Sequence, residues 1–208
     1  MAAPLAEADL ARIEAAIREA ELGTSAELVV VIAEEAVALP GGDAVPLWPA
    51  LAALILPLPL LLLVPRLPAS TVYAAQLAFL ALGLLLVLLP PVRDRLAPPA
   101  ARGDRIRAAA RDQFFERGLH LTAARTGVLL FVSPADRAAE LIADAGVRGP
   151  LPDETWRPCL DELTARAREG RLADGIVAAV ARVGAVLRAE LPGEPGDRNE
   201  IPDTAVVL

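Results

Sequence analysis

The segment from Val45 to Val92 reads VPLWPALAALILPLPLLLLVPRLPASTVYAAQLAFLALGLLLVLLPPV, and it determines how the remaining sequence is interpreted. Two apolar runs, Val45–Val64 and Thr71–Val92, flank the short break Pro65–Ser70, and neither run holds a charged residue. Each run has about 20 residues, which as a helix spans a hydrocarbon core of about 30 Å. A buried core helix rarely stays apolar on every face over this length. The segment therefore predicts a two-helix transmembrane hairpin with spans at 45–64 and 71–92.

Outside this segment the chain has the composition of an acidic soluble domain. Its 208 residues carry a net charge of −7, which gives no support to nucleic-acid binding. The single cysteine, Cys159, cannot form an internal disulfide, so no oxidising compartment is indicated. The N-terminal stretch is acidic and amphipathic and lacks the apolar core of a signal peptide.

Apolar periodicity and turn residues place the remaining elements. The predicted elements are a helix that ends at Gly23, strands at 27–33, 127–133 and 138–144, and helices at 104–117, from Asp153 onward and from Gly170 to before Pro192. The segment 34–44 is interpreted as a linker, and 93–103 as a juxtamembrane linker. The last ten residues are interpreted as a tail.

The first helix and strand, about 35 residues, are too few to bury a core alone. Their partners must lie beyond the hairpin, so residues 1–44 and 93–208 are predicted to form one discontinuous domain, with 45–92 inserted after the first strand. A long crossover containing a helix makes the first two strands parallel, and a tight turn makes the second and third antiparallel. The fold class is therefore α/β, a small mixed sheet sandwiched by helices, with the strands at 127–133 and 138–144 as the expected neighbours of the first strand.

Several stretches outside the hairpin carry a family resemblance when taken in order. They are TSAELVVVIAE, QFFERGLHLTAARTGVLLFVS, DRAAELIADAGV, then Trp156 and the terminal NEIPD. Together they resemble the TPM domain family, which includes photosystem-repair proteins of thylakoids and many bacterial relatives; Ala26 departs from the glycine that members often have. The resemblance implies an α/β sandwich. It also implies one of three roles, because relatives are described as weak acid phosphatases, calcium binders or accessory factors at membranes, and this chain is similar to the membrane-inserted bacterial branch.

The acidic residues near the second turn are the best candidates for chemistry. Glu140 and Asp144 share one face of a strand but lie about 13 Å apart, too far for one calcium ion with ligands at about 2.4 Å. A calcium site would therefore need Asp136 together with a residue from another element, such as Glu27. The competing interpretation is an edge strand with solvated charges.

Other candidates have ordinary structural interpretations. Thr24 and Ser25 could hold a phosphate but also fit a helix-to-strand turn, and no glycine-rich phosphate loop with lysine is present. His120, the only histidine, fits a helix end, since no serine lies in a nucleophile-elbow motif. Cys159 lies among apolar residues and fits a packed thiol.

Positive residues cluster after the second apolar run, while the break between the runs holds only Arg66. Because positive residues stay on the cytoplasmic side, both termini are predicted to be cytoplasmic at a bacterial inner membrane. The residues expected at the membrane surface are Arg93, Arg95, Arg102, Arg105 and Arg107, with Trp48 and Tyr73 at the two interfaces.

These features together favour a membrane-anchored accessory or interaction module whose partners are the bilayer and another membrane protein. The alternative is a weak phosphatase that depends on a divalent metal, with no cofactor indicated beyond a possible calcium ion. A pore-forming transport component is a further alternative, and apolar runs without a charged residue argue against it.

Overall fold

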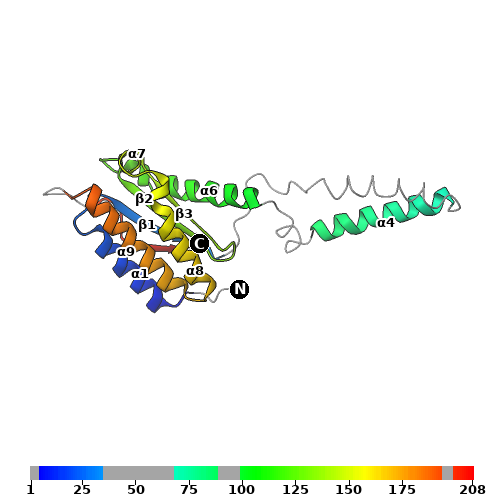
Figure 1. Ribbon diagram of the computed structural model, residues 1–208, viewed down its shortest axis with the longest axis horizontal. Helices are drawn as coiled ribbons and strands as arrows, with labels where there is room; N and C mark the ends of the chain where they lie inside the picture. Colours follow the sequence, from blue (N-terminus) through cyan, green and yellow to red (C-terminus); the bar gives the residue numbers. More distant parts are fainter. Residues whose placement is uncertain (1–4, 35–67, 89–98, 194–198) are drawn as a thin grey trace. The chain divides into compact units, whose positions relative to one another are not determined.

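A computed structural model describes residues 5–34, 68–88, 99–193 and 199–208 of the chain. The chain divides into two compact units, Met1–Ala38 with Gly103–Leu208, and Leu39–Arg102. The first unit has a mixed α/β fold with one four-stranded sheet and helices on both faces (Figure 1).

The sheet has the strand order β3-β2-β1-β4. Its strands are β1 (Glu27–Ile32), β2 (Gly127–Ser133), β3 (Ala138–Ala143) and β4 (Ala205–Val207). Strands β1 and β2 are parallel, in register from Glu27 opposite Gly127 to Ile32 opposite Val132, and β2 and β3 are antiparallel. Both predicted orientations are confirmed, and so is the central place of β1, of which every residue is buried.

The second neighbour of β1 was predicted wrongly. Residues 138–143 pair with the far edge of β2, and the open edge of β1 is taken by β4, which runs parallel to it from Val30 opposite Ala205 to Ile32 opposite Val207. The segment expected to be a tail therefore completes the sheet. A three-residue strand is too short to show an alternating pattern, so the sequence carries little signal for it.

Alternate residues of β1 face two separate cores. Leu28, Val30 and Ile32 pack with helices α1 (Glu7–Glu21), α8 (Arg157–Arg168) and α9 (Leu172–Glu190). Val29 and Val31 face the opposite side, where helix α6 (Pro99–Glu116) covers the sheet. This two-sided burial explains why the strand reads as a continuous apolar run.

Short elements complete the first unit. They are two 3-10 turns, η1 (Leu119–Leu121) and η2 (Asp153–Trp156), and the one-turn helix α7 (Ala145–Arg148). Helix α6 begins at Pro99, before the predicted start at Asp104, and α8 begins after the turn η2 rather than at Asp153. Gly118 lies between the end of α6 at Glu116 and the start of η1, with a φ of 71°, a conformation that favours glycine.

The second unit contains helix α4 (Ala69–Leu88), which overlaps the predicted second span. Among the described residues, no helix combines the length and the hydropathy needed to cross a membrane. The predicted first span, 45–64, lies outside the described residues, and a transmembrane hairpin is not seen in the part of the chain that the structure describes.

Candidate functional site

Asp136, the predicted calcium ligand, lies in the turn after β2 and is held by two neighbours. Its Oδ1 is 3.3 Å from Nη2 of Arg105, and its Oδ2 accepts a hydrogen bond of 2.8 Å from the hydroxyl of Ser133. The side chains of Arg105 and Asp136 are 4% and 6% exposed, so this is a buried ion pair that ties α6 to the end of β2. Asp136 therefore has a structural role in the arrangement observed.

The other two carboxylates of the predicted set each face a different arginine. Glu140 accepts a 2.8 Å hydrogen bond from Nε of Arg107. Asp144 accepts two hydrogen bonds from Arg125, at 2.5 and 2.9 Å, and also caps α7 by accepting from the Ala145 N–H. The Arg125 guanidinium lowers the pKa of Asp144, which keeps its carboxylate charged.

Glu27 lies at the opposite end of the sheet from Asp136. It is in register with Gly127, the first residue of β2, whereas Asp136 follows Ser133, the last residue of that strand. Six steps at about 3.3 Å separate the two ends of β2 by about 20 Å. The geometry thus does not allow one ion to take both carboxylates. Among the described residues no group of three or more His, Cys, Asp or Glu side chains is placed to hold a metal ion.

Glu27 instead holds the segment that leads into β4 by a hydrogen bond. Its Oε1 accepts a 3.0 Å hydrogen bond from the Glu200 N–H, while its buried Oε2 meets no hydrogen-bond donor among the described residues. Nearby, Glu21 accepts a 2.8 Å hydrogen bond from the Leu28 N–H and is hydrogen-bonded to Asp203. Burial, with Asp203 and Glu27 adding to it, raises the pKa of Glu21 to about 8. Glu21 therefore keeps its proton to a higher pH than an ordinary glutamic acid does.

The remaining candidates have structural partners. Thr24 donates a 2.7 Å hydrogen bond to the carbonyl of Leu191, which joins the turn before β1 to the end of α9. Cys159 is 3% exposed and its thiol donates to the carbonyl of Trp156, and burial raises the pKa of the thiol. The prediction of a packed thiol is confirmed. The ring of His120 packs against that of Phe115, with 5.1 Å between centroids.

The residues expected at a membrane surface have different surroundings. Arg105 is buried against Asp136, so its assignment to lipid headgroups is wrong; the spacing along α6 turns it toward the sheet. Arg107 is 57% exposed while paired with Glu140, and Tyr73 is 63% exposed on α4. Trp48, Arg93 and Arg95, and the side chain of Arg102, lie outside the described residues.

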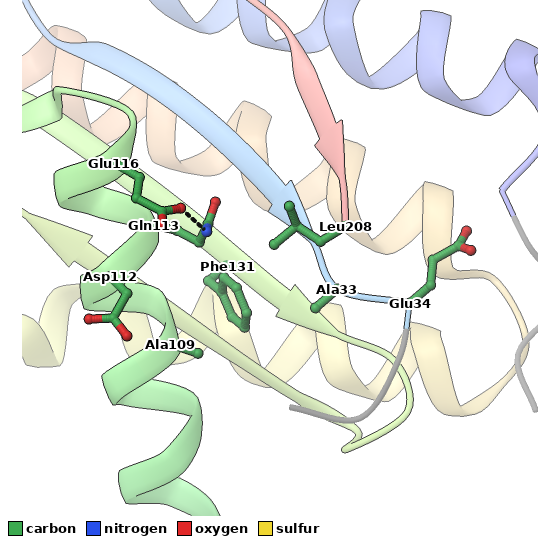
Figure 2. Close-up of a pocket in the computed structure, with 8 residues that line it drawn as sticks. All are labelled: Ala33, Glu34, Ala109, Asp112, Gln113, Glu116, Phe131 and Leu208. Atoms are coloured by element: carbon green, nitrogen blue, oxygen red, sulfur yellow. Dashed lines mark hydrogen bonds between the residues drawn. The ribbon is translucent and has the colours of Figure 1, made fainter. Parts of the chain in front are cut away.

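A pocket of about 530 Å³ lies at the carboxyl ends of β1 and β4 (Figure 2). Its apolar lining comes from Ala33 after β1, Phe131 in β2, Ala109 on α6 and Leu208 after β4. Its polar lining comes from Glu34, Asp112, Gln113 and Glu116. We call this the carboxyl-end pocket.

Sequence reasoning missed this pocket, although one signal for it exists. The residues Ala109, Asp112, Gln113 and Glu116 follow each other at helical spacing along one edge of α6, beside the apolar stripe of Ile106, Ala110 and Phe114 that faces the sheet. The Gln113 side chain donates a 2.5 Å hydrogen bond to Glu116 (Figure 2). The other wall depends on β4, which the sequence does not reveal.

Comparisons with known proteins agree with this architecture. The family model of the TPM domain matches residues 94–186. The NMR structure of the BA42 protein from the psychrophilic bacterium Bizionia argentinensis is similar with a TM-score of 0.61 and 17% sequence identity, covering 98% of this chain and 95% of that one. At this identity the likeness concerns the fold alone. No curated protein is significantly similar to the chain.

Proposed function

Since the chain contains a TPM domain at residues 94–186, we propose that it is a binding module attached to a membrane by the segment Leu39–Arg102. In this proposal the α/β unit acts as an accessory factor for another membrane protein on the cytoplasmic side of a bacterial inner membrane. The segment Val45–Val92 supplies two spans, which return the chain to the side it left.

The surface of α4 is the observation that carries this proposal. The helix has no acidic residue in its first turn and no basic residue in its last turn, and its apolar residues are spread around all sides. Six large side chains are between 37% and 66% exposed, namely Tyr73, Leu77, Phe79, Leu80, Leu82 and Leu85. Fully burying one such side chain contributes about 1.5–3 kcal/mol, so covering six half-exposed ones contributes several kcal/mol. A lipid environment supplies that cover for a helix that is apolar all round.

The arginine pairs of the predicted acidic set support binding rather than catalysis. Asp136, Glu140 and Asp144 each hold a different arginine and lie on a sheet edge and its turns. A phosphatase that depends on a divalent metal needs carboxylates that converge on one ion. The described residues offer no observation in favour of that alternative.

The test is extraction of membranes from bacteria that express the full chain. We expect the protein to stay with the membrane in alkaline carbonate, whereas a variant that lacks Val45–Val92, with the flanking linkers joined, should appear in the soluble fraction. Release of the full chain by carbonate would refute a membrane-spanning attachment. Retention of the deletion variant in the membrane would show that another part of the chain holds it there.

Orientation has its own test with topology reporters fused after Leu208 or within Pro65–Ser70. A reporter after Leu208 should be active only as a cytoplasmic fusion, and one within the break only outside the cytoplasm. The reverse pattern would contradict the proposed orientation while leaving the attachment itself intact.

A further inference from the structure

The carboxyl-end pocket lies where open α/β sheets commonly bind ligands. Strands β1 and β4 are parallel neighbours, and the pocket is lined by the residues that follow each of them, Glu34 and Leu208. Helix α6, which leads from β1 to β2, lies over one face of the sheet, and its residues Ala109, Asp112, Gln113 and Glu116 form one wall of the pocket. Open α/β sheets commonly bind ligands in crevices outside the carboxyl ends of their strands.

The pocket combines an apolar floor with an acidic rim. Ala33 and Phe131 are buried and form the floor, and Leu208 is 50% exposed at its side. Glu34, Asp112 and Glu116 are exposed on the rim, and Figure 2 shows Glu34 across the pocket from the two acids of α6. No basic residue is among the described residues that line it. Arg117 lies one turn beyond and donates to Gln113.

We propose that the carboxyl-end pocket binds a basic, partly apolar segment of a partner protein. An arginine or lysine side chain of that segment rests its aliphatic stem on the floor formed by Ala33 and Phe131, and its charged end lies between the rim carboxylates. Long basic side chains bury their methylene stems while keeping the charge near water and acids, which matches this lining. The inference deepens the proposed function, on which it rests, by naming the site and the partner's chemistry.

Charge complementarity also favours this occupant over others. An acidic segment would place like charges against three carboxylates, and a purely apolar segment would bury the rim acids without partners, which is costly. A guanidinium can form paired hydrogen bonds with a carboxylate, so arginine should bind more tightly than lysine.

The test uses the full chain in uncharged detergent micelles and a fluorescein-labelled peptide in which arginine alternates with valine. Fluorescence anisotropy should show binding that weakens as salt is raised, and matched peptides with glutamine or glutamate in place of arginine should bind at least about tenfold more weakly. No binding of the arginine peptide by the unaltered protein overturns the proposal.

Three variants separate the pocket from general attraction to an acidic protein. Asp112→Asn with Glu116→Gln should weaken arginine-peptide binding at least about tenfold, and Ala109→Met, which fills the pocket without changing charge, should weaken it at least about fivefold. The matched control, Glu7→Gln with Glu19→Gln, removes two exposed acids on α1 and should change binding less than about twofold. Circular dichroism should show all three variants folded.

Equal weakening by the rim variant and the α1 control would overturn the proposal, because binding would then follow net charge. Unchanged binding in Ala109→Met would overturn it as well, because the peptide would lie elsewhere. These outcomes are separate from the membrane test. If the protein stays in the membrane during carbonate extraction but shows no pocket-dependent peptide binding, the proposed membrane attachment stands and only the proposed binding site is refuted.

Discussion

Replacing Glu21 by Gln should make the protein more stable at alkaline pH, although it removes a half-buried carboxyl group. Glu21 ends α1, accepts the N–H of Leu28 in β1 and is hydrogen-bonded to Asp203 before β4. Gln keeps the acceptor for Leu28, and its amide can donate to Asp203 as the protonated acid does. The variant therefore imitates the protonated state of Glu21 at every pH.

The sign follows from the two pKa values of the Glu21 carboxyl. Burial raises its pKa from 4.5 to about 8 in the folded protein, so between these values the folded state binds more protons than the unfolded state. The stability due to this proton is fully present below about pH 4.5 and is lost as the pH rises through about 8. A shift of about 3.5 units at about 1.4 kcal/mol each sets a ceiling of about 5 kcal/mol. Because Glu21 retains some contact with water, we expect about 2 kcal/mol.

The assay is urea unfolding followed by the fluorescence of Trp156, which is 2% exposed in the core, in a background where Trp48 is Phe. At about pH 5 the unfolding free energies of Glu21→Gln and the parent should agree within about 1 kcal/mol, and at about pH 8.5 the variant should be more stable by about 2 kcal/mol. Glu19→Gln, on the exposed side of α1, is the matched control, and its stability relative to the parent should not change between these two pH values. A difference between variant and parent that stays constant with pH would refute the reasoning, since the Leu28 N–H and the nearby Arg18 would then fully offset the burial of the Glu21 carboxyl.

Three further predictions concern single side chains. Asp136→Asn removes the charge that faces buried Arg105 and should lower the free energy of unfolding by about 3 kcal/mol. Glu140→Gln, in the more exposed pair with Arg107, should lower it by less than about 1 kcal/mol. Urea unfolding at neutral pH measures both values. Calcium binding through Asp136 stays a prediction: if calorimetry detects binding, Asp136→Asn should weaken it by at least about 1 kcal/mol, and an unchanged affinity would exclude this ligand. Gly184→Ala places a Cβ 2.5 Å from that of Ala20 and should lower the melting temperature, because it forces α9 away from α1. In the matched variant Gly103→Ala, in α6, the new Cβ meets nothing within 4 Å, so this change should be neutral or stabilising by up to about 1 kcal/mol.

The parts of the fold that could be predicted are those with a local pattern of sufficient length. The continuous apolar runs at 27–33 and 127–133 predict strands buried on both faces, which are observed at 27–32 and 127–133, and the connections between strands fix their directions. Strand β4 could not be predicted, because Ala205–Val207 owes its conformation to pairing with β1 rather than to its own sequence.

The candidate site was harder to predict because its contacts join residues far apart in the chain. Asp136 looked available as a ligand, but the helix register of α6 brings Arg105, 31 positions earlier, against it. Glu27 looked like a ligand from a neighbouring strand, but parallel register places it at the far end of β2. In both cases the carboxylate suggested a metal ligand. The register of the helix or strand determines which residue the carboxylate contacts, and a single sequence does not reveal that register.

The position of Glu34 connects the two proposals. It lines the carboxyl-end pocket and lies 11 residues before Val45, where the first apolar run begins. Eleven residues at about 3.6 Å each reach at most about 40 Å, so a membrane attachment at Val45 would keep the pocket within that distance of the bilayer. On the cytoplasmic side, segments next to transmembrane helices are rich in lysine and arginine and adjoin apolar residues. Such a segment of a partner membrane protein has the basic and apolar residues that match the acidic rim and apolar floor of the pocket. A linker of this length would allow the pocket to reach that segment.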